Sequence, residues 1–168
     1  ITNRDIYDKV ICGPLTRARK FVWIATSDLK DLYVEKHGRM VPFLEVLSDL
    51  SERNVEIRLL HAKEPGAAFR KDFDKYPNLI NGMERVLCPR VHLKTVIVDG
   101  SFAYSGSANL TGAGMGAKSE HKRNFESGII TDDGEIIAGI MEQFDSIWRG
   151  NHCSGCGRKK FCGDYKDI

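Results

Sequence analysis

Residues 91–109 read VHLKTVIVDGSFAYSGSAN, with a β-rich run on each side of Asp99-Gly100. An Asp-Gly pair between two such runs is typical of a tight hairpin turn. We therefore predict one strand over 91–98, a second strand over 101–105, and antiparallel pairing between them.

The segments before this hairpin predict a strand–helix–strand unit. Residues 20–26 form a continuous β-rich run, which is typical of a strand covered on both faces. Residues 41–53 carry apolar side chains at helical spacing, and residues 55–60 are again β-rich. A helix between two strands at this spacing favours a parallel pair. We also expect an opening helix over 2–19, although residues 12–14 (Cys-Gly-Pro) interrupt its pattern and could instead mark a loop, and a loop or short helix over 27–39.

The segments after the hairpin predict a further strand over 125–131 and a closing helix over 135–148. The apolar face of that helix is expected to consist of Ile136, Ile140, Phe144 and Ile147. The predicted fold class is α/β, with a mixed, largely parallel β-sheet flanked by helices over residues 1–150. A small Cys-rich C-terminal appendix follows over residues 151–168.

Polar side chains in and beside the hairpin form a candidate phosphate-binding cradle. His92 and Lys94 are two residues apart on the predicted strand, so their side chains share one face. Ser107 and Asn109, beyond the second strand, add a hydroxyl and an amide. An imidazole, a cation and neutral donors suit a phosphate and nucleophilic or acid–base chemistry near neutral pH. The alternative is a strand histidine with satisfied hydrogen bonds beside a solvated lysine.

The spacing of these residues resembles a known motif. The pattern His-x-Lys-x(4)-Asp-x(6)-Gly-Ser-x-Asn is the HKD motif of the phospholipase D superfamily, and this chain fills it without departure. The residues that fill it are His92, Lys94, Asp99, Gly106, Ser107 and Asn109. The chain is most similar to the short, single-motif, nuclease-like branch, and the resemblance covers most of residues 15–150.

The resemblance implies a phosphodiesterase that works in two steps and needs no metal for its chemistry. In the family, one histidine attacks phosphorus to form a phosphohistidine, and a second histidine protonates the leaving oxygen. Because this chain has one motif, the resemblance implies a homodimer in which each subunit supplies one His92. Lys94, Ser107 and Asn109 would bind the phosphate oxygens and stabilise the developing charge.

Two acidic residues complete the predicted site. Glu126 matches the position at which the family carries a carboxylate that hydrogen-bonds a catalytic histidine. Such a partner fixes the tautomer and stabilises the imidazolium. The alternative for Glu126 is a solvent-facing strand residue. Asp99 belongs to the motif, but its place at the hairpin turn favours a structural role over contact with substrate.

The C-terminal appendix carries a candidate metal site. Cys153, Cys156 and Cys162 have the spacing Cys-x(2)-Cys-x(5)-Cys, which suits a structural zinc. His152 is available as a fourth ligand, although neighbouring ligands on one metal are geometrically awkward. The alternatives for this position are Asp164, Cys12 or a distant histidine. An iron–sulfur cluster, or one disulfide with a free thiol, also fits this spacing.

Composition limits the kind of substrate. Hydrophobic residues make up 42% and charged residues 29% of the 168 residues, which excludes collagen-like, coiled-coil and wholly disordered chains. A net charge of +2 gives no strong field over the whole molecule, so an anionic substrate must be held by a local site. Basic residues in the tail and the lack of a lipid-binding apolar stretch favour DNA or RNA. The alternatives are a phospholipid hydrolase or transphosphatidylase acting on membrane lipid, and a catalytically weak module that binds a nucleic-acid backbone.

The sequence contains no basic segment followed by an apolar run of the kind that directs secretion. The separated cysteines also favour a reducing compartment over a disulfide-stapled fold. We therefore expect a cytoplasmic location. Since the sequence begins at Ile1 rather than Met, a removed N-terminal segment stays open.

Overall fold

The structure, a computed structural model, describes residues 1–30 and 32–165. Its α-helices are α1 (Arg4–Ile6), α2 (Phe43–Glu52), α3 (Ala67–Phe73), α4 (Leu79–Gly82) and α5 (Gly134–Trp148). Helices of other types are η1 (Tyr7–Ile11), η2 (Leu15–Arg17), η3 (Glu120–Lys122) and η4 (Lys159–Phe161). Its strands are β1 (Phe21–Thr26), β2 (Tyr33–Lys36), β3 (Arg39–Pro42), β4 (Glu56–His61), β5 (Glu84–Leu87), β6 (Thr95–Val98), β7 (Phe102–Gly106) and β8 (Gly128–Thr131).

The main sheet is mixed, as predicted, and its strand order is β5-β4-β1-β6-β7-β8. β1 pairs in parallel with β4, and β4 pairs in parallel with β5, which confirms the predicted strand–helix–strand unit. The pairs β1–β6, β6–β7 and β7–β8 are antiparallel. The sheet is therefore parallel in its β5–β4–β1 half and antiparallel across β1–β6–β7–β8. The short turn between β6 and β7 can join only antiparallel neighbours.

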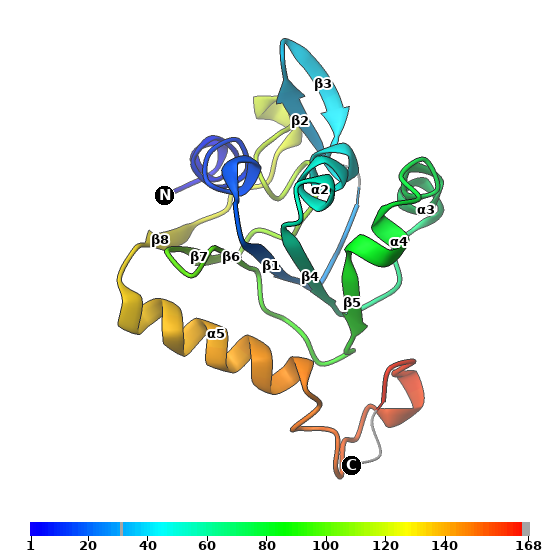
Figure 1. Cartoon of the computed structure of the whole chain (residues 1–168). Helices are drawn as coiled ribbons and strands as arrows, with labels where there is room; N and C mark the ends of the chain where they lie inside the picture. The colour runs from blue at the N-terminus through cyan, green and yellow to red at the C-terminus, as the bar shows by residue number, and fades with distance from the viewer. Residues whose placement is uncertain (31, 166–168) are drawn as a thin grey trace.

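Helices cover both faces of this sheet, with α5 on one face and α2 and the N-terminal helices on the other (Figure 1). Val22 and Ile24 of β1 pack in the core on the α2 side, whereas Ala25 packs in the core on the α5 side. β1 is therefore buried on both faces, as its continuous apolar run predicted. The other buried residues of the α5 core are Leu60, Val91, Ile97, Ala103, Ile137 and Phe144.

Three local predictions were wrong. The opening helix does not run through to residue 19: α1 and η1 follow each other without a gap and end at Ile11, and η2 begins at Leu15. Pro14 has no backbone N–H with which to continue the helix, so the alternative of a loop at residues 12–14 is the one that the structure confirms. The segment predicted as a loop or short helix contains the β2–β3 hairpin, which turns at His37 and Gly38 with φ of 52° and 74°. In α5 the buried residue is Ile137 rather than Ile136, whose side chain is 49% exposed.

The β6–β7 hairpin confirms the predicted turn. Asp99 and Gly100 both have positive φ, 55° and 69°, and the Ser101 N–H donates to the Val98 carbonyl over 3.1 Å. The regular part of β6 is shorter than predicted, since it begins at Thr95 rather than at residue 91.

The residues after α5 dock against the end of the edge strand β5 rather than extending away from the domain. The Leu87 N–H donates to the Asp164 carboxylate over 2.7 Å, and the Cys162 thiol donates to the Leu87 carbonyl over 3.2 Å. These two bonds pair the backbone groups at the end of β5 with the tail. Among the described residues, none of the helices has the length and apolar character needed to cross a bilayer.

Candidate active site

Four chain segments meet at one edge of the sheet, and strand register brings them there. Thr95, the first residue of β6, lies opposite Ala25 near the end of β1 and opposite Ser105 near the end of β7. Gly106 at the end of β7 lies opposite Gly128 at the start of β8. The residues that follow β1 and β7, and those that precede β6 and β8, therefore share this edge.

His92 and Lys94 lie in the segment that enters β6, and they contact each other directly. The Lys94 ammonium is 3.0 Å from His92 Nε2 and donates to the His92 carbonyl over 2.8 Å. Lys94 is 8% exposed, whereas the His92 side chain is exposed. Burial lowers the pKa of Lys94, and the nearby Glu126 carboxylate opposes that shift. A nearly buried cation thus lies beside a solvent-accessible imidazole.

Ser107 and Glu126 form a second pair beside the first. The Ser107 hydroxyl donates to Glu126 Oε2 in a short hydrogen bond, and the Ser127 N–H donates to the Ser107 hydroxyl over 3.1 Å. Asn124 Nδ2 donates to the other carboxylate oxygen of Glu126 over 3.0 Å. Within the described part of this chain, Glu126 therefore bonds Ser107 and Asn124 and makes no hydrogen bond with His92.

Gly106 permits the close approach on which this pair depends. A Cβ at this position would lie 2.4 Å from the Tyr104 hydroxyl and 2.5 Å from the Ser127 carbonyl oxygen. Both distances are far below van der Waals contact, so a larger residue would separate β7 from β8. The motif glycine is therefore required here for packing, because a side chain at this position would clash with β7 and β8.

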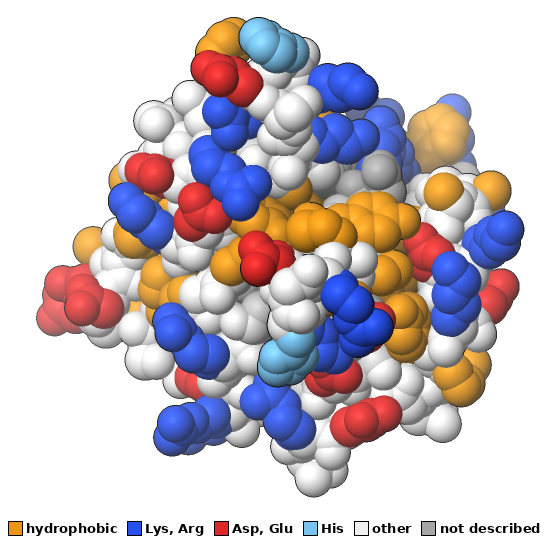
Figure 2. Space-filling model, turned by 90° about the horizontal axis from the view of Figure 1, so that it is seen from above, with side chains coloured by type: hydrophobic (Ala, Val, Ile, Leu, Met, Phe, Trp, Pro, Cys, Tyr) orange, Lys and Arg blue, Asp and Glu red, His pale blue; other side chains and the backbone are white. Residues whose placement is uncertain are grey.

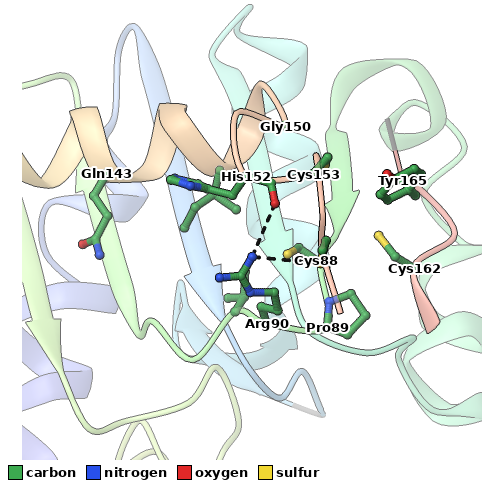
Figure 3. A pocket seen from close by; sticks show the side chains of 12 residues that line it. Cys88, Pro89, Arg90, Gln143, Gly150, His152, Cys153, Cys162 and Tyr165 are labelled. Carbon is green, nitrogen blue, oxygen red and sulfur yellow. Dashed lines mark hydrogen bonds between the residues drawn. The ribbon is translucent and has the colours of Figure 1, made fainter. Parts of the chain in front are cut away.

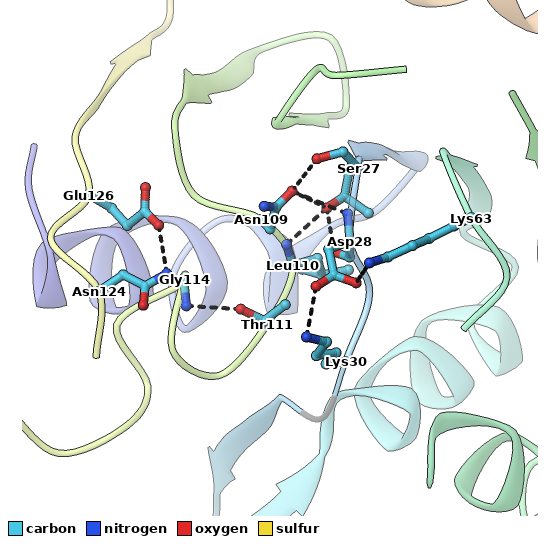
Figure 4. A network of polar contacts seen from close by, with 11 residues as sticks. Ser27, Asp28, Lys30, Lys63, Asn109, Leu110, Thr111, Gly114, Asn124 and Glu126 are labelled. Carbon is cyan, nitrogen blue, oxygen red and sulfur yellow. Dashed lines mark hydrogen bonds and ion pairs between the residues drawn. The ribbon is translucent and has the colours of Figure 1, made fainter. Parts of the chain in front are cut away.

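Asn109 is oriented by the segment that follows β1. Its Oδ1 accepts hydrogen bonds from the Ser27 hydroxyl over 2.7 Å and from the Asp28 N–H over 3.2 Å (Figure 4). These bonds fix the amide so that its Nδ2 donors lie at the opposite end of the group from Ser27 and Asp28. Asn109, Asp28 and Asn124 line one pocket of about 320 Å³.

Sequence reasoning missed the charged group beside Asn109. Asp28 forms ion pairs with Lys30 over 3.1 Å and with Lys63 over 3.0 Å (Figure 4). Burial raises the pKa of Asp28, but the two lysines outweigh it and lower the pKa below its usual value. No signal in the sequence identifies Asp28, because its place beside the motif follows only from the pairing of β1 with β6.

Asp99 lies away from the other motif residues that meet at this edge of the sheet. It lies at the far end of β6, where its carboxylate accepts backbone N–H bonds from Lys20 over 2.7 Å and from Phe21 and Arg19 over 3.0 Å each. Burial raises its pKa, and these three donors lower it further than burial raises it. The motif aspartate joins the hairpin turn to the start of β1, in agreement with the structural role favoured for it.

The predicted metal ligands lie at a separate pocket. His152, Cys153, Cys156 and Cys162 line a pocket of about 230 Å³ between the tail, the end of β5 and α5, and Cys88 lines it too (Figure 3). The His152 ring bonds the Ser146 hydroxyl through Nε2 over 2.8 Å. Among residues 1–30 and 32–165, no three His, Cys, Asp or Glu side chains are grouped so that they could hold a metal ion as they stand. Zinc in this tail therefore stays a prediction.

Comparison with known proteins gives the family. A family model described as "Cardiolipin synthase, PLD-like domain" matches residues 11–148. A mitochondrial cardiolipin hydrolase from Chlamydomonas reinhardtii is 26% identical over 105 residues, which cover 62% of this chain and 44% of that protein. The chain thus matches less than half the length of this curated relative.

Two solved structures share the fold. NucT from Helicobacter pylori superposes with a TM-score of 0.64 at 18% identity, covering 87% of this chain and 89% of that chain. TrmBL2, an archaeal chromatin protein, superposes with a TM-score of 0.58 at 15% identity, covering 87% of this chain and 49% of that chain. The family match extends from η1 to the end of α5 and includes the complete motif, so the chain belongs to the phospholipase D-like domain family.

Proposed function

We propose that this protein hydrolyses nucleic-acid phosphodiester bonds through a phosphohistidine on His92, in an active site completed by a second copy of the chain. The contact between the exposed His92 imidazole and the nearly buried Lys94 ammonium carries the proposal. A nucleophile at the surface can reach a large substrate, and a cation beside it stabilises the charge that develops on the phosphoryl oxygens.

The proposed reaction has two steps, the formation of the phosphohistidine and its hydrolysis. A ring nitrogen of His92 attacks phosphorus, the bond from phosphorus to the leaving oxygen breaks, and His92 of the partner subunit gives that oxygen a proton. His92 of the partner subunit then takes a proton from water, whose oxygen attacks phosphorus and breaks the phosphorus–nitrogen bond. Lys94 and the Nδ2 donors of Asn109 bind the non-bridging oxygens, so the catalytic groups need no metal.

An apolar patch beside the site supports the dimer. The patch is defined as Phe125, which is 95% exposed, and Ile129 on the edge strand β8, which is 59% exposed; Ile130, 37% exposed, points to the opposite face of that strand. Phe125 directly precedes Glu126, so a second copy packed here would lie next to the site. A two-fold contact through this patch would place two copies of His92 in one cleft.

Local cations support nucleic acid as the substrate. Seen from the side of the β2–β3 hairpin, Lys and Arg side chains are spread around a strip of apolar side chains, with acidic groups among them (Figure 2). This face therefore offers no uniform basic field, and binding depends on cations close to the site. Lys30 and Lys63, both more than 60% exposed, pair there with Asp28, which lines one pocket with Asn109. TrmBL2, which shares the fold, is a chromatin protein that binds DNA.

A phospholipid is the second candidate substrate. The exposed Phe125 next to Glu126 could contact acyl chains, and the curated relative is named as a cardiolipin hydrolase. Both substrates present a phosphodiester, so His92 and Lys94 serve either one. A panel of substrates separates the two candidates.

The test offers single- and double-stranded DNA, RNA and cardiolipin vesicles to the wild type and to His92→Asn, with and without brief exposure to a chelator. His37→Asn is the matched control, because His37 is exposed and its left-handed φ of 52° is one that asparagine accepts. We expect nucleic-acid cleavage that survives the chelator, persists in His37→Asn and is lost in His92→Asn. Cleavage of cardiolipin alone, or binding of nucleic acid without cleavage, would overturn the proposal.

A further inference from the structure

The pocket beside the tail gathers four of the five cysteines of the chain. Cys153, Cys156 and Cys162 come from the tail, whereas Cys88 directly follows β5 in the folded domain (Figure 3). All four thiols are free and partly buried. Cys88 is far from the tail in sequence, and the docking of the tail on β5 brings the two segments together.

We propose that this pocket binds one structural zinc ion through the thiolates of Cys88, Cys153, Cys156 and Cys162. Four thiolates around one ion match the tetrahedral sulfur coordination that structural zinc prefers. Cys88 supplies the fourth ligand that the spacing of the tail leaves undetermined.

The turn that carries the first pair of tail cysteines has the form of a metal knuckle. The Cys156 N–H donates to the Cys153 carbonyl over 3.0 Å, and Gly155 takes the left-handed conformation with φ of 67°. The Arg90 guanidinium lies 3.9 Å from Cys156 Sγ, and a cation beside sulfur stabilises the thiolate, which is the form that binds a metal.

The third tail cysteine is fastened next to Cys88. In its protonated form the Cys162 thiol donates to the carbonyl of Leu87, the residue that precedes Cys88, over 3.2 Å, and this bond holds the sulfur next to Cys88. Zinc binding removes the thiol proton, so the thiolate would exchange this bond for the metal. The Asp164 carboxylate bonds the Leu87 N–H over 2.7 Å. Both ends of this tail segment thus contact one residue of β5, and the Cys162 and Cys88 side chains line the same pocket.

The other candidates for the fourth ligand are engaged elsewhere. His152 bonds Ser146 over 2.8 Å, and it is the chain neighbour of Cys153. Asp164 bonds the Leu87 N–H. Cys12 lines a different pocket with Val34 and Glu35 and packs against the core on the α2 side of the sheet.

Charge and space in the pocket suit a metal–thiolate centre. Zinc with four thiolates carries a net charge of −2, and the Arg90 guanidinium, 3.9 Å from Cys156 Sγ, lies ready to compensate it. The thiols are not yet grouped around a metal position within the described residues, so binding requires them to turn into the pocket. Its volume of about 230 Å³ accommodates that rotation.

The site would also connect the tail to the segment that carries the histidine of the motif. Residues 88–91 line the pocket in succession, and His92 follows them directly. A metal at Cys88 would therefore order the start of the β5–β6 connection. The zinc proposal rests on the thiols alone and does not depend on the proposed substrate.

The first experiment measures metal content in the whole purified chain. We expect one zinc per chain in the wild type, in Cys12→Ser and in His152→Ala, and less than a tenth of that in Cys88→Ser. Cobalt exchanged into the wild type should give the visible and charge-transfer bands of a tetrahedral site with four thiolates. Bound iron, a metal-free protein with a disulfide among the four cysteines, or full zinc retention in Cys88→Ser would overturn the proposal.

A second measurement covers the case in which Cys88→Ser fails to fold. The wild type is alkylated with zinc bound and after zinc removal, and each cysteine is followed by peptide mass. Cys88, Cys153, Cys156 and Cys162 should react at least about tenfold faster after zinc removal, whereas Cys12 should be unchanged. If the rate at Cys88 does not depend on zinc, Cys88 is not a ligand.

Discussion

The sheet edge and the tail pocket bring polar residues together in different ways. At the sheet edge, backbone pairing sets the positions: the Gly106 N–H donates to the Lys94 carbonyl, and the Ser107 N–H donates to the Ser127 carbonyl. In the tail, η4 is a single short turn, and the apolar side chain of Phe161 is 57% exposed.

The difference indicates what each region needs to stay ordered. At the sheet edge, the backbone positions are fixed by a sheet that is buried on both faces. Its reactive side chains can therefore be exposed and still be held in place. The tail buries little apolar surface of its own, so it needs another source of stability to stay ordered. The proposed zinc site would supply it by joining the tail to the domain. A mutation at His92 should therefore leave metal binding intact.

The largest expected effect is at His92. His92→Asn should lower kcat by about 10³-fold or more, because the proposed nucleophile and the proposed acid are both lost. The free energy of unfolding should change by less than about 0.5 kcal/mol, since the side chain is exposed. Turnover and denaturant unfolding, measured on the same preparation with zinc content recorded, test both expectations. A variant that keeps wild-type turnover would remove His92 from the mechanism.

A smaller but still large effect is expected at the apolar patch. Phe125→Glu places a charge where we propose that two copies meet, so the dimer should dissociate and activity per chain should fall about tenfold to a hundredfold at low protein concentration. Ile80→Glu is the matched control, because Ile80 is 67% exposed on α4, away from β8. Sedimentation and the concentration dependence of activity are the measurements. A monomeric Phe125→Glu with full activity would contradict the shared site.

Much of the sheet edge could be predicted because its signals lie within short stretches of sequence. The motif spacing and the Asp99-Gly100 turn identify the hairpin, and the apolar run over 20–26 identifies the central strand. The contact of Asn109 with Ser27 could not be predicted, because it depends on which strand lies beside β6. Cys88 was missed for the same reason, since its relation to the tail appears only when the tail docks on β5.

The local errors have physical causes as well. Strands β2 and β3 are four residues each and expose several side chains, so no apolar alternation marks them. The choice between Ile136 and Ile137 depends on a rotation of one residue about the α5 axis. Asp133 fixes where the helix begins, because its carboxylate accepts the N–H groups of Glu135 and Ile136 over 2.9 and 3.1 Å, and packing on the sheet then buries Ile137 and Phe144.

Asp99→Asn should lower stability and spare the chemistry. Asparagine accepts the positive φ at this position, so the variant mainly removes the charge that three backbone N–H groups bond, at a cost of about 1–3 kcal/mol. Folding lowers the pKa of Asp99, so the ionised carboxylate stabilises the folded state. This contribution to the free energy of unfolding is fully present above the unfolded pKa of about 3.9, and it is lost as the pH falls through the folded pKa.

Unfolding of Asp99→Asn and wild type at several pH values measures this contribution, with exposed Asp132→Asn as the control. The difference in stability between Asp99→Asn and wild type should shrink on acidification, whereas Asp132→Asn should match the wild type throughout. A loss of turnover in the folded Asp99→Asn variant at neutral pH would show instead that the turn reaches the chemistry.

The smallest expected effect is at the cations beside Asn109. Lys63 is 61% exposed and pairs with Asp28, so Lys63→Ala removes one mobile charge while Lys30 still neutralises that carboxylate. Binding of single-stranded DNA to the inactive His92→Asn background should weaken a few-fold, and the slope of log affinity against log salt should fall by about one. Lys20→Ala is the control, because Lys20 precedes β1 at the opposite edge of the sheet and should leave the slope unchanged. An unchanged slope in Lys63→Ala would mean that the substrate does not pass over the end of β1. The basic tail would then be the next surface to test, by the same measurement on substitutions of its lysines.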